Sequence, residues 1–189
     1  MRRWPRGRAM VDPATSRNLL GQLSFVLVAL GVIFVQLLPL TTAPRIWTPP
    51  DVLLLAALAW VVRRPDYLPV WLVAAVFLLT DFLLHRPPGL FAALMVLLTE
   101  ALRRRAPGLW TAPFLMEWLA VSVGIAAVTL GNRMVLSIAM TPQAPLGLTL
   151  IQMGMSILFY PVIVFAAAVA LGITRPTPGE AETPSGRIW

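Results

Sequence analysis

Charged side chains inside apolar segments are the residues of this sequence whose types and positions could do chemistry. Asp81 lies near the end of one apolar run and Glu100 near the end of the next, while a later run contains both Glu117 and Arg133. A charged group in a membrane helix is costly unless it is paired or faces water, so each is a candidate functional residue. An Asp81–Arg133 ion pair between two helices would let both groups remain ionised, and we predict that these residues are coupled.

Simpler interpretations compete with a functional one. Glu100 can pair with Arg103 or Arg104 one turn along its own helix, an interfacial contact that contributes little to stability. Glu117 is expected near the same surface, within reach of that arginine cluster. Arg133 can extend its side chain along its own helix towards the aqueous surface instead of pairing with an acid.

The sequence lacks the residue sets of common catalytic and metal sites. It has no cysteine and one histidine, His85, which excludes thiolate nucleophiles, disulfides and zinc sites built on cysteine. It contains no Ser-His-Asp set, HExxH motif or glycine-rich phosphate loop. A pair of catalytic carboxylates would have to lie at one depth, whereas Asp81 and Glu100 are expected at opposite faces. We therefore expect a protein that is not an enzyme and that uses no cofactor or metal.

The composition is that of a membrane protein. Hydrophobic residues form 58% of the chain and charged residues only 12%, and the mean hydropathy is +0.80. These values predict an all-α integral membrane protein. The net charge of +7 does not indicate a nucleic-acid partner, because all fifteen basic residues are arginines in short clusters between apolar runs.

The apolar runs predict a six-span helical bundle. The expected spans cover residues 19–40, 51–62, 67–84, 89–102, 114–140 and 146–173, and the expected cytoplasmic tails cover residues 1–18 and 174–189. The first run is too long for the core of a signal peptide, so we expect it to be retained. The second is too short to cross a bilayer of about 30 Å, so we expect it to extend into the preceding loop or to be lined by protein.

Local signals predict where helices begin and end. Asp51 and Asp66 are expected to cap the second and third helices. Pro88 and Gly89 belong to an HRPPG turn that must reverse the chain, because proline cannot continue a helix and glycine accepts left-handed backbone angles.

Two features of the last two spans concern helix packing. Small residues recur at three- and four-residue steps along the fifth span: Ala120, Gly124, Ala127 and Gly131. Such a strip lets two helices approach closely. Pro161 lies within the sixth span, where it should kink the helix and free the carbonyl group of Ile157.

The arginines also predict the orientation of the bundle. With the N-terminus inside and six spans, twelve of the fifteen arginines lie in inner segments, two in outer segments and Arg133 within a span. Because positive charge accumulates on the cytoplasmic side of membrane proteins, this distribution places both termini in the cytoplasm.

Two stretches in the centre of the chain form a recognisable pattern. They are PPDVLLLAALAWVVRRPDYLP at residues 49–69 and TDFLLHRPPGLFAALMVLLTEALRRR at residues 80–105. A short Pro-Asp-led leucine run, an Arg-Arg-Pro turn and an aspartate before a Pro-Gly-Leu turn together resemble the bacterial rod shape-determining protein MreD family. Asp81, Pro88 and Gly89 match the patterned turn of that family.

This resemblance implies a non-enzymatic scaffold of the cell-elongation machinery in the bacterial inner membrane. Members of the family pair with the membrane protein MreC and work alongside the actin-like MreB and the peptidoglycan synthases. Their fold is similar to that of the substrate-binding subunits of energy-coupling-factor vitamin transporters. Arg133 matches no position of the family pattern, so its role rests on the physical argument alone.

The alternative is a small-molecule membrane transporter subunit of the vitamin-binding kind. Such a subunit would need a central pocket with convergent polar and aromatic groups. In this sequence the polar groups are expected towards the two faces, and the midplane is nearly all apolar. This distribution favours the scaffold.

Overall fold

The chain folds as a bundle of helices. The computed structural model describes residues 13–38 and 48–172, and within them it contains six α-helices and one 3₁₀ turn: α1 (Pro13–Leu37), α2 (Val52–Arg63), η1 (Pro65–Tyr67), α3 (Val70–Leu83), α4 (Leu90–Thr111), α5 (Phe114–Ile138) and α6 (Leu146–Leu171). Three stretches of these helices are long and apolar enough to cross a membrane: Asn18–Leu37, Phe114–Ile138 and Leu146–Ala170. The all-helical prediction is therefore confirmed. Most of the predicted tail 1–18 and all of the tail 174–189 lie outside the described residues.

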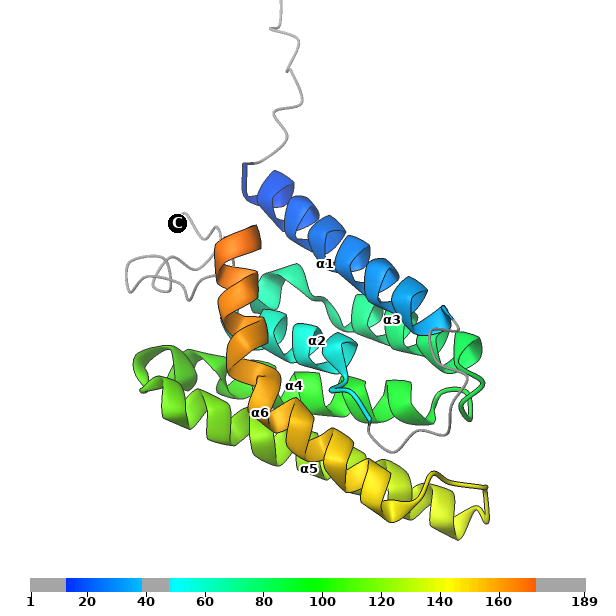
Figure 1. Ribbon diagram of the computed structural model, residues 1–189. Coiled ribbons are helices and arrows are strands. Elements are labelled where there is room, and N and C mark those ends of the chain that lie inside the picture. The colour runs from blue at the N-terminus through cyan, green and yellow to red at the C-terminus, as the bar shows by residue number, and fades with distance from the viewer. Residues whose placement is uncertain (1–12, 39–47, 173–189) are drawn as a thin grey trace, which may run out of the picture.

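Helix α2 occupies the centre of the bundle, where it packs against α1, α4 and α6 (Figure 1). Its sequence, VLLLAALAWVVR, is apolar on every side, and eleven of its 12 residues are buried. A helix that is hydrophobic all round is stable only when neighbours cover it. Of the two predicted explanations for its shortness, the protein-lined one is therefore confirmed.

Both ends of α2 are tied to other helices. At the N-terminus the Asp51 carboxylate accepts the N–H of Leu54 at 3.1 Å, and the Asp51 N–H donates to the hydroxyl of Ser156 in α6 at 3.0 Å. At the C-terminus the indole N–H of Trp110 in α4 donates to the Val62 carbonyl at 2.7 Å. These bonds satisfy backbone groups that a short helix leaves without intrahelical partners. The predicted cap at Asp51 is confirmed.

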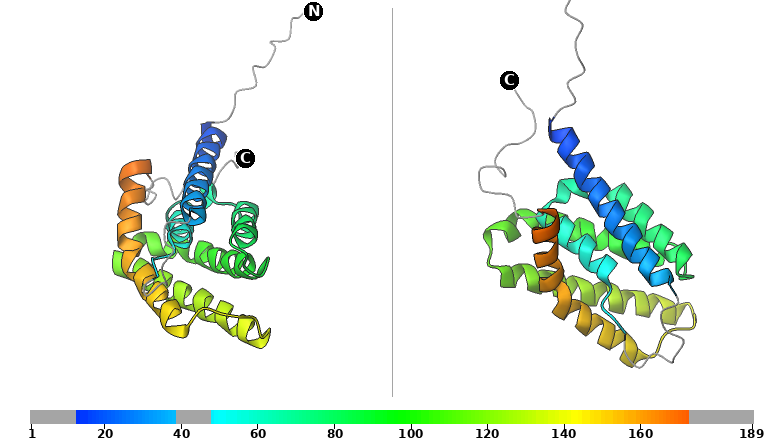
Figure 2. Two further views of the ribbon diagram at one scale, coloured as in Figure 1. Left: turned by 45° about the vertical axis from the view of Figure 1, so that its right-hand side comes forward. Right: turned by 45° about the horizontal axis from the view of Figure 1, so that its top comes forward.

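Helix α1 lies on one side of α2, and the α5–α6 pair lies on the other (Figure 2). One face of α1 buries Phe25 and Ala29, and the opposite face exposes Leu23 and Leu27. At Gly21 the helix touches the ring of Tyr67 so closely that an added Cβ would lie 2.3 Å from it. Glycine therefore permits the approach of α1 to the η1 turn.

The α3–α4 hairpin ends α3 with a Schellman motif. The N–H of His85 donates to the carbonyl of Phe82 at 3.3 Å, and the N–H of Arg86 donates to the carbonyl of Asp81 at 2.9 Å. His85 takes the left-handed position that glycine usually fills, with φ of 53°. Gly89, the residue before α4, has φ of 86°, so the predicted backbone role of this glycine is confirmed.

The α5–α6 hairpin is built in the same way. The N–H of Met140 donates to the carbonyl of Ser137 at 3.2 Å, and the N–H of Thr141 donates to the carbonyl of Leu136 at 3.0 Å. Met140 has φ of 50°, again a left-handed position without glycine. The two turns lie at the same end of the bundle, because residues of both line a single cavity there.

Helix α6 bends part-way along its length (Figures 1 and 2), and Pro161 lies inside it. Proline cannot bond to the carbonyl four residues earlier, and the freed group on Ile157 accepts the indole N–H of Trp118 in α5 at 2.9 Å. The predicted kink is thus accompanied by a hydrogen bond between α5 and α6 that the sequence alone did not indicate.

The strip of small residues on α5 faces α4 in part. A Cβ added to Gly124 would lie 2.6 Å from a methyl group of Leu98, and one added to Gly131 would lie 3.9 Å from Leu94. Ala127 is exposed instead. Close approach of the two helices therefore depends on Gly124 and not on the whole strip, because a Cβ at Gly131 would make only an ordinary van der Waals contact.

Several predicted helix ends are wrong. Helix α4 does not stop at residue 102 but continues to Thr111 through Pro107, because side chains of its last turns bond to backbone carbonyls of neighbouring segments. Asp66 does not cap α3; it lies in η1, and α3 follows Pro69 with no side-chain cap. Helix α1 begins at Pro13, within the predicted tail, but its apolar stretch begins at Asn18, one residue from the predicted start of the first span.

Candidate functional site

Asp81 is fully buried, and it braces the α3–α4 turn. Its Oδ2 accepts the N–H of Gly89 at 3.1 Å and the N–H of Ala92 at 3.2 Å, both at the start of α4. A carboxylate at this position satisfies unpaired amide donors and interacts favourably with the positive end of the helix dipole. The predicted Asp81–Arg133 pair is therefore wrong, because the nearby amide groups of the turn already hold the carboxylate.

Arg133 bridges α5 to the start of α6. Its Nη1 donates to the carbonyl of Ala144 and to the hydroxyl of Thr149, both at 3.0 Å. The guanidinium group neither pairs with a carboxylate within the described ranges nor simply extends along its own helix.

The opposite end of the bundle contains an ion pair in the interior. The Nε of Arg63 in α2 lies 3.4 Å from the Oε1 of Glu117 in α5, and the same oxygen accepts the hydroxyl of Tyr160 in α6 at 2.9 Å. Glu117 and Tyr160 are fully buried. The predicted arginine partners of Glu117 are therefore replaced by Arg63, which lies at the C-terminus of the central helix.

Glu100 behaves as the simpler interpretation predicted. Its carboxylate lies 3.6 Å from Arg103 and 3.8 Å from Arg104, one turn along α4. About a third of the Glu100 side chain is exposed. This pair stays near the surface and contributes little to stability.

The two ends of the bundle differ in their charges. We call the end that holds Arg63, Arg64 and the triplet Arg103–Arg105 the arginine-rich end. We call the other end, with the α3–α4 and α5–α6 turns, the cavity end. Its described arginines are Arg86 and Arg133.

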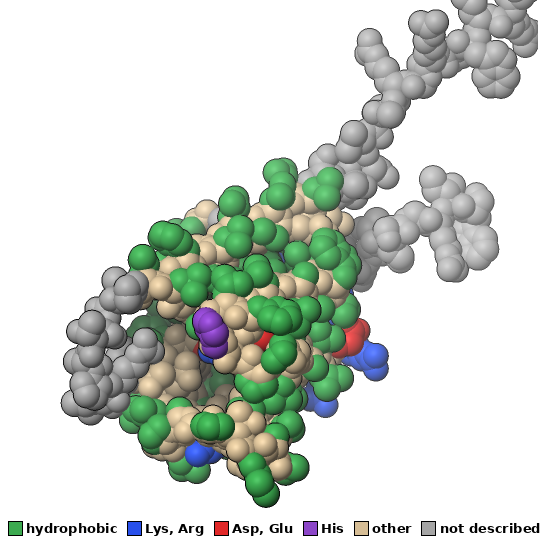
Figure 3. Space-filling model, turned by 90° about the vertical axis from the view of Figure 1, so that its right-hand side faces the viewer, with side chains coloured by type: hydrophobic (Ala, Val, Ile, Leu, Met, Phe, Trp, Pro, Cys, Tyr) green, Lys and Arg blue, Asp and Glu red, His purple; other side chains and the backbone are tan. Residues whose placement is uncertain are grey.

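The cavity end contains a hollow of about 350 Å³. The N-terminus of α2, the two turns, the second half of α5 and the first half of α6 form its walls. Figure 3 shows the face that carries it: apolar side chains cover most of this face, and the surface is hollowed beside the histidine.

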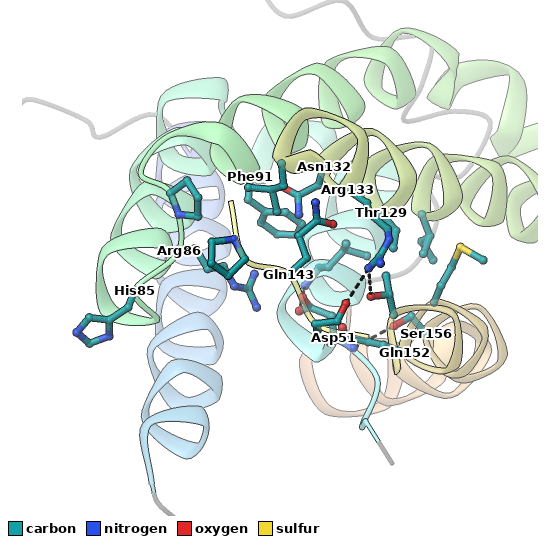
Figure 4. A pocket seen from close by; sticks show the side chains of 18 residues that line it. Asp51, His85, Arg86, Phe91, Thr129, Asn132, Arg133, Gln143, Gln152 and Ser156 are labelled. Carbon is teal, nitrogen blue, oxygen red and sulfur yellow. Dashed lines mark hydrogen bonds between the residues drawn. The ribbon is translucent and has the colours of Figure 1, made fainter. Parts of the chain in front are cut away.

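Polar and charged groups gather in this cavity. Figure 4 shows Arg86 entering from the α3–α4 turn and Arg133 from α5, whereas the ring of His85 points away. The remaining polar lining comes from α2, α5, the α5–α6 turn and α6: Asp51, Thr129, Asn132, Gln143, Thr149, Gln152 and Ser156. The sequence predicted polar groups towards the two faces of the membrane, but it did not reveal that several of them enclose one pocket.

Arg86 is half-buried and rests on an aromatic ring. Its Cζ lies 5.1 Å from the ring centre of Phe91 in α4, a cation–π contact. From the sequence, Arg86 was expected only as one of the two arginines in outer segments. One sequence signal could have indicated this contact: an arginine in a tight turn, five residues before a phenylalanine. That spacing alone is a weak signal when the fold is not known.

The guanidinium groups of Arg86 and Arg133 supply the cavity with hydrogen-bond donors that a bound molecule could accept. No group of three or more histidines, cysteines or acids that could hold a metal ion occurs in the described part of the chain. Pro88 lies exposed in the turn and Gly89 shapes its backbone, so neither contributes a reactive group.

No family model, curated protein or solved structure gives a significant match to this chain.

Proposed function

We propose that this protein is a non-enzymatic scaffold of the bacterial inner membrane that holds a transmembrane helix of a partner in the cell-elongation machinery. The partner is an MreC-like membrane protein, in keeping with the resemblance of residues 49–69 and 80–105 to the MreD family. In this proposal all six helices are embedded in the bilayer, as in the substrate-binding subunits of energy-coupling-factor transporters.

The observation that carries the proposal is the braced α3–α4 hairpin at one edge of the bundle. Helix α3 packs mainly on α4 and exposes Trp71, Leu78 and Phe82. Asp81 locks the turn, and Pro87 and Pro88 stand exposed on it. Lipid tails give helices no hydrophobic drive to associate, so a partner helix requires a fixed surface of this kind.

The orientation of the scaffold follows from its arginines. The arginine-rich end would face the cytoplasm and the cavity end the outside, as the positive-inside rule requires. The short α2 would remain within the bilayer because other helices cover it, although its 12 residues measure only about 18 Å.

Replacement of Gly89 by valine tests the scaffold. Nothing lies within 4 Å of the added Cβ, so the strain comes only from the left-handed backbone, which a β-branched residue tolerates poorly. We expect Gly89→Val to insert into the membrane, to lose co-purification with the MreC-like partner and to leave rod-shaped cells rounded. Gly89→Asn is the matched control, since asparagine accepts this backbone region, and it should retain the partner.

Reporter fusions test the six-span topology. Fusions at Thr42, Arg64, Pro87, Pro113, Ala144 and Thr183 should alternate between the outside and the cytoplasm, beginning outside. Pro113 is chosen because it lies between α4 and α5. An external reporter at Thr183 would reject the topology.

The cavity favours a second function, that of a small-molecule membrane transporter subunit. Its volume of about 350 Å³ falls within the roughly 300–1,000 Å³ of ligand pockets. Depletion of the protein separates the two functions. Cells that widen and round support the scaffold, whereas normal width with impaired vitamin uptake supports the transporter.

A further inference from the structure

We propose that the cavity binds a small organic carboxylate, with Arg86 and Arg133 holding the carboxylate and the apolar wall covering the body of the molecule. This binding site goes beyond the scaffold role, and in the transporter alternative it names the class of substrate.

The charges of the lining point to an anion. Two guanidinium groups and one carboxylate, that of Asp51, line the cavity, which gives it a formal charge of +1. Asp51 forms no ion pair with either arginine, and its Oδ1 is used to cap α2. A positive lining inside an apolar bundle is costly unless water or an anion compensates it.

Both arginines are held in place and keep donors available. The planar group of Arg86 lies over the Phe91 ring, and none of its N–H groups bonds to another described residue. Arg133 is fixed through Nη1 alone, which leaves its Nε and Nη2 donors without a partner among residues 13–38 and 48–172. A guanidinium group presents such donors in a planar fork that matches the two oxygens of a carboxylate.

The rest of the lining favours an organic body over an inorganic ion. Leu54, Phe91, Ile125 and Met153 provide apolar wall, and the hollow is much larger than an isolated oxyanion needs. Amide groups of Asn132 and Gln152 can bond to polar substituents. Ligand sites typically combine an apolar wall with a few polar groups in this way.

Thermal unfolding of the purified full-length protein in detergent tests the site with benzoate as the probe. Sodium benzoate should raise the unfolding midpoint saturably, since a ligand that binds only the folded state stabilises it. Benzamide, which has the same body without the charge, and inorganic phosphate, which has the charge without the body, should each bind at least tenfold more weakly. Sodium chloride at equal ionic strength controls for salt.

Substitutions assign the effect to the cavity. Arg86→Gln should weaken benzoate binding at least tenfold, and Thr129→Leu, which fills the cavity without changing its charge, should abolish it. Arg105→Gln, at an exposed position of the arginine-rich end, should bind like the wild type. Arg133→Gln is less informative, because Arg133 also holds α5 to α6.

Equal responses to benzoate and benzamide, or unchanged benzoate binding in a folded Arg86→Gln protein, would overturn the assignment, as would the absence of any benzoate response. If phosphate binds as tightly as benzoate, the claim that the site recognises the organic part of the ligand is rejected. The titration measures neither partner co-purification nor cell width. A negative result would therefore reject the ligand site without rejecting the scaffold, and loss of the scaffold role would not reject the ligand site.

Discussion

Arginines lie within the bundle at both the arginine-rich end and the cavity end, but their partners differ between the two ends. At the arginine-rich end Arg63 meets Glu117, and Tyr160 donates to the same carboxylate, so three helices are joined in a closed cluster. At the cavity end Arg86 and Arg133 meet aromatic and neutral polar groups and form no ion pair with a described carboxylate.

This difference separates structural charges from charges available for binding. A buried ion pair whose partners lie on different helices favours one packing of those helices, and its two charges already compensate each other. Arginines that line a hollow of about 350 Å³ can instead meet an outside group. Removing a partner of the Arg63–Glu117 pair should therefore mainly lower stability, whereas removing the guanidinium group of Arg86 should mainly weaken binding.

The largest effect on stability is expected from Glu117→Ala. Removing one partner of a buried ion pair leaves the other charge uncompensated, which costs about 3–5 kcal/mol. We expect the free energy of unfolding, measured by denaturant titration in micelles, to fall by about that amount. The side chain of Arg63 is only 11% exposed, so water can compensate it only partly.

Two controls sharpen this test. Glu100→Ala removes a surface pair on α4 and should change the free energy of unfolding by less than about 1 kcal/mol. The double change Arg63→Met with Glu117→Leu should recover much of the loss, because apolar residues often replace buried ion pairs without penalty. If Glu117→Ala costs no more than Glu100→Ala, the arginine-rich end is not a structural cluster.

A smaller effect is expected from Asp81→Ala. This change removes the two hydrogen bonds that the amide groups of Gly89 and Ala92 donate to the Asp81 carboxylate, each contributing about 1.5–3 kcal/mol. Because it also removes the cost of burying a carboxylate, we expect the free energy of unfolding to fall by only about 1.5–3 kcal/mol in total. Since Asp81 and Arg133 share no hydrogen-bond partner, the double change with Arg133→Gln should be additive to within about 0.5 kcal/mol in a double-mutant cycle. A larger coupling energy would indicate that Asp81 and Arg133 do form the ion pair that the sequence suggested.

Local physics made part of this fold predictable. Asp51 precedes a helix and caps it, Glu100 meets arginines one turn away, and Pro161 frees a carbonyl at a fixed spacing. Each of these outcomes depends on residues close together in the sequence. The shortness of α2 left two possibilities, extension into the preceding loop or a covering of protein, and the structure shows the second.

The contacts between distant segments could not be predicted from the sequence. Asp81 was predicted to pair with Arg133, but amide groups a few residues away donate to its Oδ2 instead. Glu117 pairs with Arg63 because α2 runs through the centre of the bundle and ends beside α5. The cavity is formed by parts of four helices and two turns, so no single stretch of sequence carries its signal.

The smallest effects are expected from His85→Gly and Met140→Gly, and they test whether backbone strain is concentrated at the cavity end. Both of the non-glycine residues with positive φ in the described part of the chain end helices there, where Schellman motifs prefer glycine. Left-handed angles cost an ordinary residue about 1–2 kcal/mol, and glycine's greater freedom in the unfolded chain offsets part of the gain. Each change should therefore raise the free energy of unfolding by about 0.5–1 kcal/mol.

Met140 is the cleaner case, because its side chain is 92% exposed and little packing is lost with it. Gly89→Ala, which introduces a side chain at φ of 86°, should shift the unfolding midpoint in the opposite direction. If Met140→Gly destabilises the protein, the left-handed residue is not strained, and the turns of the cavity end are held by contacts of their side chains.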